Sequence, residues 1–219
     1  YAFKKRILIT LNKIQLFVGN MDADIVIPDS NEHEFIDIAS KLGYKKLYFL
    51  YDFDKKDKMP KNHDAGKNIT IESGFLVNPK NAVSAKKYSR LLVAQSSDND
   101  RYLIESRKIR IIYGFESTGK KDYIHQRASG LNHVICSLAS KNNISVGLCY
   151  GSLSGNKIKN SVLIGRMMQN IKLCQRCKTR TIIASFAKRP FAMKSPYDVA
   201  ELFSVLGMAR KNINDSANF

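Results

Sequence analysis

The sequence has no tryptophan, only four histidines and only four cysteines in 219 residues. No apolar run approaches the ~18 residues that a membrane-spanning helix needs. The glycine-rich motifs of dinucleotide-binding and P-loop proteins do not follow any predicted strand, and the Gly-x-Ser-x-Gly motif of serine hydrolases is missing. These absences exclude the commonest families of phosphate-binding open-sheet proteins. They also leave the chain without the nucleophile motif of serine hydrolases. Serines in the loops, such as Ser117 and Ser152, are typical of turns.

Acidic residues are scarce in one half of the chain. Between residues 107 and 194 there are seventeen Lys or Arg but only Glu116 and Asp122 as acids. Residues 1–100 carry a net charge of +3 (16 basic, 13 acidic) and residues 101–219 carry +14 (20 basic, 6 acidic), which together give +17. Such a one-sided positive field favours an anionic partner, and a phosphate backbone is the first candidate. The alternative is a solvated cationic surface suited to a high-salt or thermophilic cytosol.

The histidines do not form a metal-binding pattern. Metal-dependent hydrolases on βα repeats place His or Asp pairs directly after strands, whereas here no His-x-His pair follows the first predicted strand. Only Asp122, His125 and His133 fall close together in one connection. We therefore expect no catalytic residues and no bound metal or cofactor. A metal-dependent phosphoesterase that uses these three residues stays as the alternative.

Cysteine usage fits a reducing compartment, so we expect a cytoplasmic protein. Cys136 and Cys149 lie in apolar runs that predict core positions. Cys174 and Cys177 form a Cys-x-x-Cys pair, which is typical of zinc or redox sites. No second pair completes four ligands, and the pair falls in the middle of a predicted helix, where two small side chains on one helical face also explain it.

Residues 1–20 do not belong to the predicted domain. Lys4-Lys5-Arg6 before Ile7-Leu8-Ile9 imitates a signal peptide, but Thr10, Asn12 and Lys13 interrupt the apolar stretch and no small-residue cleavage site follows. We interpret residues 1–20 as a basic N-terminal extension, or as sequence upstream of a natural start at Met21. Residues 21–212 are predicted to form a single domain.

Short β-branched runs alternate with stretches of helical period along this domain. Strands are predicted at 24–28, 47–51, 69–76, 90–94, 109–113, 144–149 and 181–186, and helices at 32–42, 81–88, 101–107, 132–141, 160–177 and 197–206. Asp29 or Ser30 is the expected cap of the first helix. Seven or eight βα units with apolar strands favour a parallel sheet covered by helices, and at this length a closed or nearly closed (β/α) TIM-like barrel.

Three basic clusters accompany the predicted barrel. The connection 119–130, Gly-Lys-Lys-Asp-Tyr-Ile-His-Gln-Arg-Ala-Ser-Gly, follows the fifth strand, and residues 185–196 follow the last strand. Both loops should emerge at the carboxyl end of the strands, where barrels place their functional residues. Lys157, Lys159 and Arg166 form a third cluster at the start of the long helix. Asp122 is expected to orient a neighbouring His or Arg, or to form a local salt bridge.

Several segments share the pattern of one known family: Lys121-Asp122 with His125-x-Arg127-x-Ser129-Gly130-Leu131-Asn132-His133, Ile144–Leu148, Arg166–Asn170, and Thr181–Ser185 with Ser195–Val199. By these segments the chain resembles the ribonuclease P protein component 3 family, the barrel-shaped subunit shared by archaeal and eukaryotic enzymes. The resemblance covers about residues 113–208 and is looser over 21–112. The loop 116–126 is longer than in compact relatives, so the resemblance fixes the register of Lys120 and Lys121 only to within a residue or two.

The resemblance implies a fold and a role. The family adopts a (β/α) barrel that is related to metal-dependent phosphoesterases of the polymerase and histidinol phosphatase type without their metal site. Its members bind RNA and, with a small partner protein, help a catalytic RNA remove 5′ leaders from precursor tRNA, with divalent ions on the RNA. By position it implies RNA-binding roles for Lys120, Lys121, Arg127 and His133. Charge and loop placement add Lys141, Lys188, Arg189 and Lys194.

A third hypothesis makes the barrel mainly a scaffold whose basic surface contacts acidic proteins. It differs from the RNA-binding hypothesis in what copurifies with the chain: acidic proteins that stay after nuclease treatment, rather than RNA.

Overall fold

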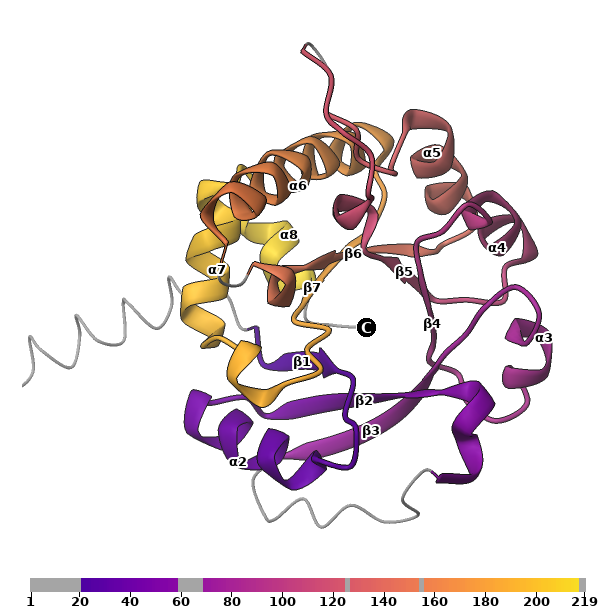
Figure 1. Cartoon of the computed structure of the whole chain (residues 1–219), viewed down its shortest axis with the longest axis vertical. Helices are drawn as coiled ribbons and strands as arrows, with labels where there is room; N and C mark the ends of the chain where they lie inside the picture. Colours follow the sequence, from indigo (N-terminus) through magenta and orange to yellow (C-terminus); the bar gives the residue numbers. More distant parts are fainter. Residues whose placement is uncertain (1–20, 59–68, 125–126, 154–155, 217–219) are drawn as a thin grey trace, which may run out of the picture.

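Residues 21–58, 69–124, 127–153 and 156–216 are described by a computed structural model, and they form a (β/α) barrel with helices around the outside of a parallel sheet (Figure 1). The N-terminal extension proposed at residues 1–20 lies outside the described residues. The strands stand in sequence order: β1 (Ala23–Val26), β2 (Lys46–Asp52), β3 (Thr70–Leu76), β4 (Leu92–Gln95), β5 (Ile111–Tyr113), β6 (Ser145–Cys149) and β7 (Thr181–Ala184).

Helices connect these strands. They are α2 (Glu32–Leu42), α3 (Ala82–Ala85), α4 (Asp100–Ser106), α5 (His133–Lys141), α6 (Lys157–Cys177), α7 (Pro196–Val205) and α8 (Arg210–Asp215). Short 3-10 turns follow four of the strands: η1 (Phe53–Lys58), η2 (Phe115–Ser117), η3 (Tyr150–Ser152) and η4 (Pro190–Ala192).

The barrel closes between its first and last strands. Val26 and Ala187 form a parallel bridge, and the Phe186 amide donates to the Ile25 carbonyl at 2.8 Å. The predicted barrel is confirmed, with seven strands in the part of the chain that the structure describes.

Apart from the first half of β3, the strands are largely apolar on both faces, because one face fills the barrel and the other meets the helices. The barrel interior contains Ala23, Ile25, Tyr48, Leu50, Val93, Ile111, Tyr113, Ile182, Ala184 and Phe186. Outside, Leu47 and Phe49 of β2 pack against Phe35 and Ala39 of α2. This double burial explains why continuous apolar runs, rather than alternating ones, marked the strands in the sequence.

A ring stack closes the interior near the carboxyl ends of the strands. The rings of Tyr113 and Phe186 lie parallel, with centroids 3.9 Å apart. Gly147 of β6 makes room for the stack, since a Cβ there would lie 2.6 Å from the Tyr113 Cβ and 3.1 Å from the Phe186 ring.

Helix ends differ from the prediction where side-chain caps decide them. The long helix α6 begins at Lys157 rather than at residue 160, because the Asn156 side chain accepts hydrogen bonds from the Ile158 and Lys159 amides. Neither Asp29 nor Ser30 caps α2: its N-cap residue is Asn31, whose side chain instead accepts from the Asp29 amide. Helix α8 was not predicted.

Among the buried carboxyl groups, those of Asp24 and Glu116 lie at the carboxyl end of the barrel. Asp24 accepts hydrogen bonds from the Tyr150 hydroxyl at 2.8 Å and from the Ser185 amide at 2.7 Å, and burial raises its pKa to about 6. Glu116 accepts from the Cys149 amide at 3.0 Å. Burial raises the pKa of Glu116 from its ordinary 4.5 to about 7, which hydrogen bonds from its own amide and the Cys149 amide only partly offset.

Glu116 should make the fold less stable as pH rises. The folded carboxyl holds its proton more tightly than the unfolded one, so the folded state loses stability between about pH 4.5 and about pH 7. Glu116→Gln should remove this loss, which amounts to about 2–3 kcal/mol at alkaline pH. Urea unfolding of both proteins at about pH 5 and about pH 8 measures it. Asp24 titrates equally in both proteins and cancels in the comparison. A stability difference that is the same at both pH values would contradict the prediction.

Candidate nucleic-acid interface

The loop between β5 and α5 is held by one buried arginine of α6. Arg166 is 3% exposed, and its guanidinium donates to the Glu116 carbonyl at 3.0 Å and to the Thr118 carbonyl at 2.8 Å. It also donates to the Thr118 hydroxyl, to the Lys120 carbonyl and, at 2.8 Å, to the Asp122 carboxylate. Arg166 therefore fixes the backbone from 116 to 122. It is not part of an exposed basic cluster, and that prediction for Arg166 was wrong.

Asp122 completes the attachment of the loop. Its carboxylate also accepts from the Arg127 guanidinium at 3.1 Å and from the Ala128 amide at 2.8 Å. Partial burial opposes its ionisation, but the Ala128 amide and the guanidinium groups of Arg166 and Arg127 outweigh this and lower its pKa. The expected local salt bridge of Asp122 is thus confirmed with two arginines.

Further hydrogen bonds tie the two sides of the loop at its base. The Thr118 hydroxyl donates to the Ala128 carbonyl at 2.7 Å, and the Gly130 amide donates to the Phe115 carbonyl at 2.9 Å. The Ser129 hydroxyl donates to the Asn170 side chain of α6 at 2.6 Å. The base of the loop is thus fixed where the loop leaves the barrel, at the top of Figure 1.

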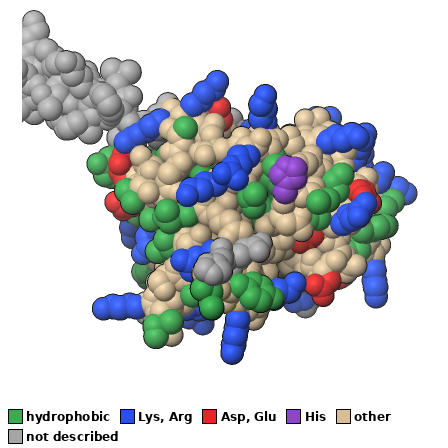
Figure 2. Space-filling view, turned by 90° about the horizontal axis from the view of Figure 1, so that it is seen from above, with side chains coloured by type: hydrophobic (Ala, Val, Ile, Leu, Met, Phe, Trp, Pro, Cys, Tyr) green, Lys and Arg blue, Asp and Glu red, His purple; other side chains and the backbone are tan. Residues whose placement is uncertain are grey.

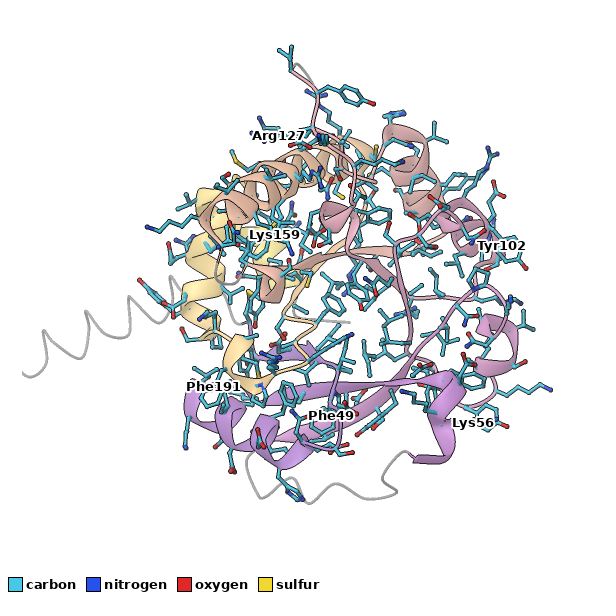
Figure 3. All side chains as sticks on the ribbon, viewed as in Figure 1. Phe49, Lys56, Tyr102, Arg127, Lys159 and Phe191 are labelled. Atoms are coloured by element: carbon cyan, nitrogen blue, oxygen red, sulfur yellow. The ribbon has the colours of Figure 1, made fainter. Side chains whose placement is uncertain are left out.

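The loop presents cations and two apolar side chains to solvent. Lys120 and Lys121 are exposed, Tyr123 is 76% exposed and Ile124 is 96% exposed. The Arg127 guanidinium lies over Gly165 of α6, where a Cβ would approach it to 2.5 Å (Figure 3). The loop therefore offers both charge and an aromatic ring, the two groups with which proteins hold single-stranded RNA.

A pocket of about 380 Å³ separates this loop from the start of α6. Ser117, Thr118 and Lys120 line it on the loop side, and Asn156 and Lys159 line it on the helix side. Lys159 extends the cationic surface of the loop (Figure 3), although it was not among the candidate RNA-binding residues. Its place in the first turn of a helix that follows a strand could have indicated it, because such turns lie at the carboxyl end of a barrel.

The other candidate residues divide between the two ends of the barrel. His133 is the first residue of α5, and Lys188, Arg189 and Lys194 follow β7, so these four lie at the carboxyl end of the strands. All four are exposed. Lys141 is the last residue of α5 and therefore lies at the opposite, amino end of the barrel, and its RNA-binding role stays a prediction.

Figure 2 looks at the molecule from above Figure 1, onto the side where the β5–α5 loop projects. Lys and Arg side chains are spread over this face, and Asp and Glu side chains are few. An anion approaching from this side meets mainly positive charge.

The alternative metal site would use Asp122, His125 and His133. Of these residues, Asp122 and His133 are described by the structure, and they do not form a metal site. Both carboxylate oxygens of Asp122 are bound by arginines and an amide. His133 is exposed at the start of α5, and His125 lies outside the described residues. Within the described ranges, no group of three or more His, Cys, Asp or Glu side chains is arranged to hold a metal ion.

Three of the cysteines, Cys136, Cys174 and Cys177, lie where α5 packs against α6, and Cys149 ends β6. Cys136 and Cys174 are buried with their Sγ atoms 3.9 Å apart, and the Ser137 hydroxyl donates to the Cys177 sulfur. All four cysteines are free thiols. Cys177 ends α6, so the pair lies in the last turn and not in mid-helix as predicted. None of the helices in the described ranges is long and apolar enough to cross a membrane.

The fold and this surface define a (β/α) barrel with a rigid cationic loop at the carboxyl end of its strands. Residues 121–216 match the family model of RNase P subunit p30. The match includes Asp122, Arg127 and Arg166, which together hold the loop.

Solved structures show the same fold. A chain of the cryo-EM structure of archaeal ribonuclease P with mature tRNA superposes with a TM-score of 0.70 at 18% identity, over 88% of this chain and 87% of that one. An amidohydrolase crystal structure superposes with a TM-score of 0.50 at 7% identity, over 89% of this chain and 71% of that one.

Replacing Arg166 should release the loop and destabilise the barrel. Arg166→Met leaves several carbonyls and the Asp122 carboxylate without their buried donor, which costs about 2–4 kcal/mol. Arg166→Lys should rescue only part of this, since one ammonium cannot reach acceptors on both sides of a planar guanidinium. Urea unfolding gives the free energies, and limited proteolysis between residues 117 and 128 reports on the loop. Wild-type stability of Arg166→Met would contradict the assignment.

Proposed function

We propose that this chain is the RNA-binding protein subunit of a ribonuclease P, which assists the catalytic RNA in removing 5′ leaders from precursor tRNA. The observation that carries the proposal is the family match over residues 121–216. The likeness in fold to a chain of archaeal ribonuclease P supports it. The partners would be the ribonuclease P RNA, precursor tRNA and a small protein subunit.

The geometry supports a role in positioning RNA. Lys120 of the loop and Lys159 of α6 line one pocket. Lys121 and Arg127 are exposed on the same loop as Lys120. Phosphate contacts from such residues fix the orientation of an RNA without reading its bases. Specificity would then come from the shape of the folded RNA and from the partner protein.

The chemistry would take place on the RNA. Asp122, the acid nearest to the cationic loop residues, is bound by Arg166 and Arg127, and Glu116 is buried with a raised pKa. We propose that the chain binds no cofactor and that the divalent ions of the reaction are held by the RNA. The four free thiols support a cytoplasmic location.

The double variant Lys120→Gln/Lys121→Gln tests the proposal. It should weaken binding to a ribonuclease P RNA transcript at every sequence tested, and it should slow leader removal in a reconstituted particle. The slope of log affinity against log salt should fall by about 0.7–0.9 for each phosphate that the variant no longer neutralises.

The matched control is Lys172→Gln/Arg176→Gln, which removes the same charge from exposed positions on α6. If leader removal and the salt slope are unchanged in the Lys120/Lys121 variant, the loop is not the RNA-binding surface. If the control loses as much affinity, only net charge matters and the loop has no special role.

A further inference from the structure

A second basic hollow lies at the amino end of the barrel, opposite the β5–α5 loop. It has a volume of about 950 Å³ and is lined from β2 and β3 on one side and from the segments before β4 and β5 on the other. Its cationic lining residues are Lys86, Arg90, Arg107, Lys108 and Arg110. α3 and α4, which lead into these segments, lie side by side at the right of Figure 1.

The strand register explains why this hollow exists. β3 pairs with β2 along all seven of its residues, but it pairs with β4 only at Phe75 and Leu76. β4 begins at Leu92, so the first residues of β3 have no strand beside them on that side. The chain before β4 instead passes over this gap, with the Ser89 hydroxyl donating to the Ser73 carbonyl at 3.4 Å. The hollow is therefore a fixed feature of the sheet.

The charge of the hollow is not balanced by its own acids. The acidic lining residue is Glu72, whose carboxylate lies 2.6 Å from the Lys46 ammonium. Arg107 donates to the Asn142 side chain, which is neutral. Within the described residues, no salt bridge includes any of the five cations. Such a group of cations with low-dielectric walls attracts anions strongly.

The shape and the donor set favour a polyanionic backbone over a single small anion. The cations come from two separate segments, 86–90 and 107–110, so they face a ligand along its length. Three of them are arginines, whose planar forks match phosphate groups. Tyr88 lines the same hollow and is 60% exposed, and the Lys56 ammonium lies over its ring, 4.5 Å from the centroid, which brings a further cation to this side of the hollow.

We propose that this amino-end groove binds the phosphate backbone of a second RNA segment, distinct from the one at the β5–α5 loop. The inference rests on the proposed RNA-binding function and adds a second face to it. The barrel would then hold two RNA segments on its opposite ends. Arg90 and Arg110 are the residues to test, since both are exposed and neither makes a side-chain hydrogen bond to a described residue.

The test uses the full chain with Arg90→Gln/Arg110→Gln and a labelled single-stranded oligouridylate as the first probe. The slope of log affinity against log salt should fall by about 1.4, because each phosphate contact to a single strand contributes about 0.7. Lys172→Gln/Arg176→Gln, with the same loss of charge on α6, should change the slope less. If the salt slope falls equally in the groove variant and in the control, the proposal that the groove binds RNA is overturned.

A ribonuclease P RNA transcript is the second probe, read by hydroxyl-radical footprinting. The groove variant should lose protection at one RNA segment, and Lys120→Gln/Lys121→Gln should lose it at another. Loss at the same segment would overturn the two-face arrangement. If only the Lys120/Lys121 variant binds more weakly, the groove inference fails and the proposed function stands.

Two further outcomes separate the remaining explanations. If the wild-type chain protects no RNA, the proposed function fails together with the groove. If the groove variant binds RNA normally but loses binding to a polyglutamate peptide, the groove is a site for an acidic protein and the inference is overturned.

Discussion

The cationic loop depends on one buried guanidinium. Arg166 uses its donors on the backbone carbonyls of Glu116, Thr118 and Lys120 and on the Asp122 carboxylate. Carbonyl oxygens carry partial negative charge, so they stabilise the buried cation without adding acids to the surface. The loop can therefore be rigid and strongly positive together. Salt bridges alone would have fixed it only by cancelling the charge with which it meets an anion.

Much of the fold could be predicted because the strands and helices show distinct apolar patterns. The role of Arg166 was missed because basic residues are seldom buried, so a Lys and Arg cluster was interpreted as surface. Helical spacing contained the correct signal: Arg166 shares a face with Leu163, Met167 and Asn170, all of which are buried. Its acceptors are carbonyls of a distant loop, which no sequence pattern marks.

The division of charge between the two ends could also have been predicted. In a (β/α) barrel, residues after a strand lie at one end, and residues before the next strand lie at the other. Lys141 and Arg110 precede strands, whereas Lys121 and Arg189 follow them. The basic half of the chain therefore does not form one surface, because its residues alternate between the two ends of the barrel. The hollow beside β3 could not have been predicted, because it results from the late start of β4, and strand ends are the least certain part of any sequence-based assignment.

The two cationic ends have opposite effects on the free chain and on the assembly. Like charges crowded around a groove repel one another and weaken the isolated barrel. A bound phosphate backbone replaces that repulsion with attraction, so whatever binds the folded chain also stabilises it. The charge that costs the free protein stability is then the charge that would couple its folding to the proposed RNA partner. Near the β5–α5 loop the acids do not cancel this charge, because Glu116 is buried and Asp122 is bound by two arginines.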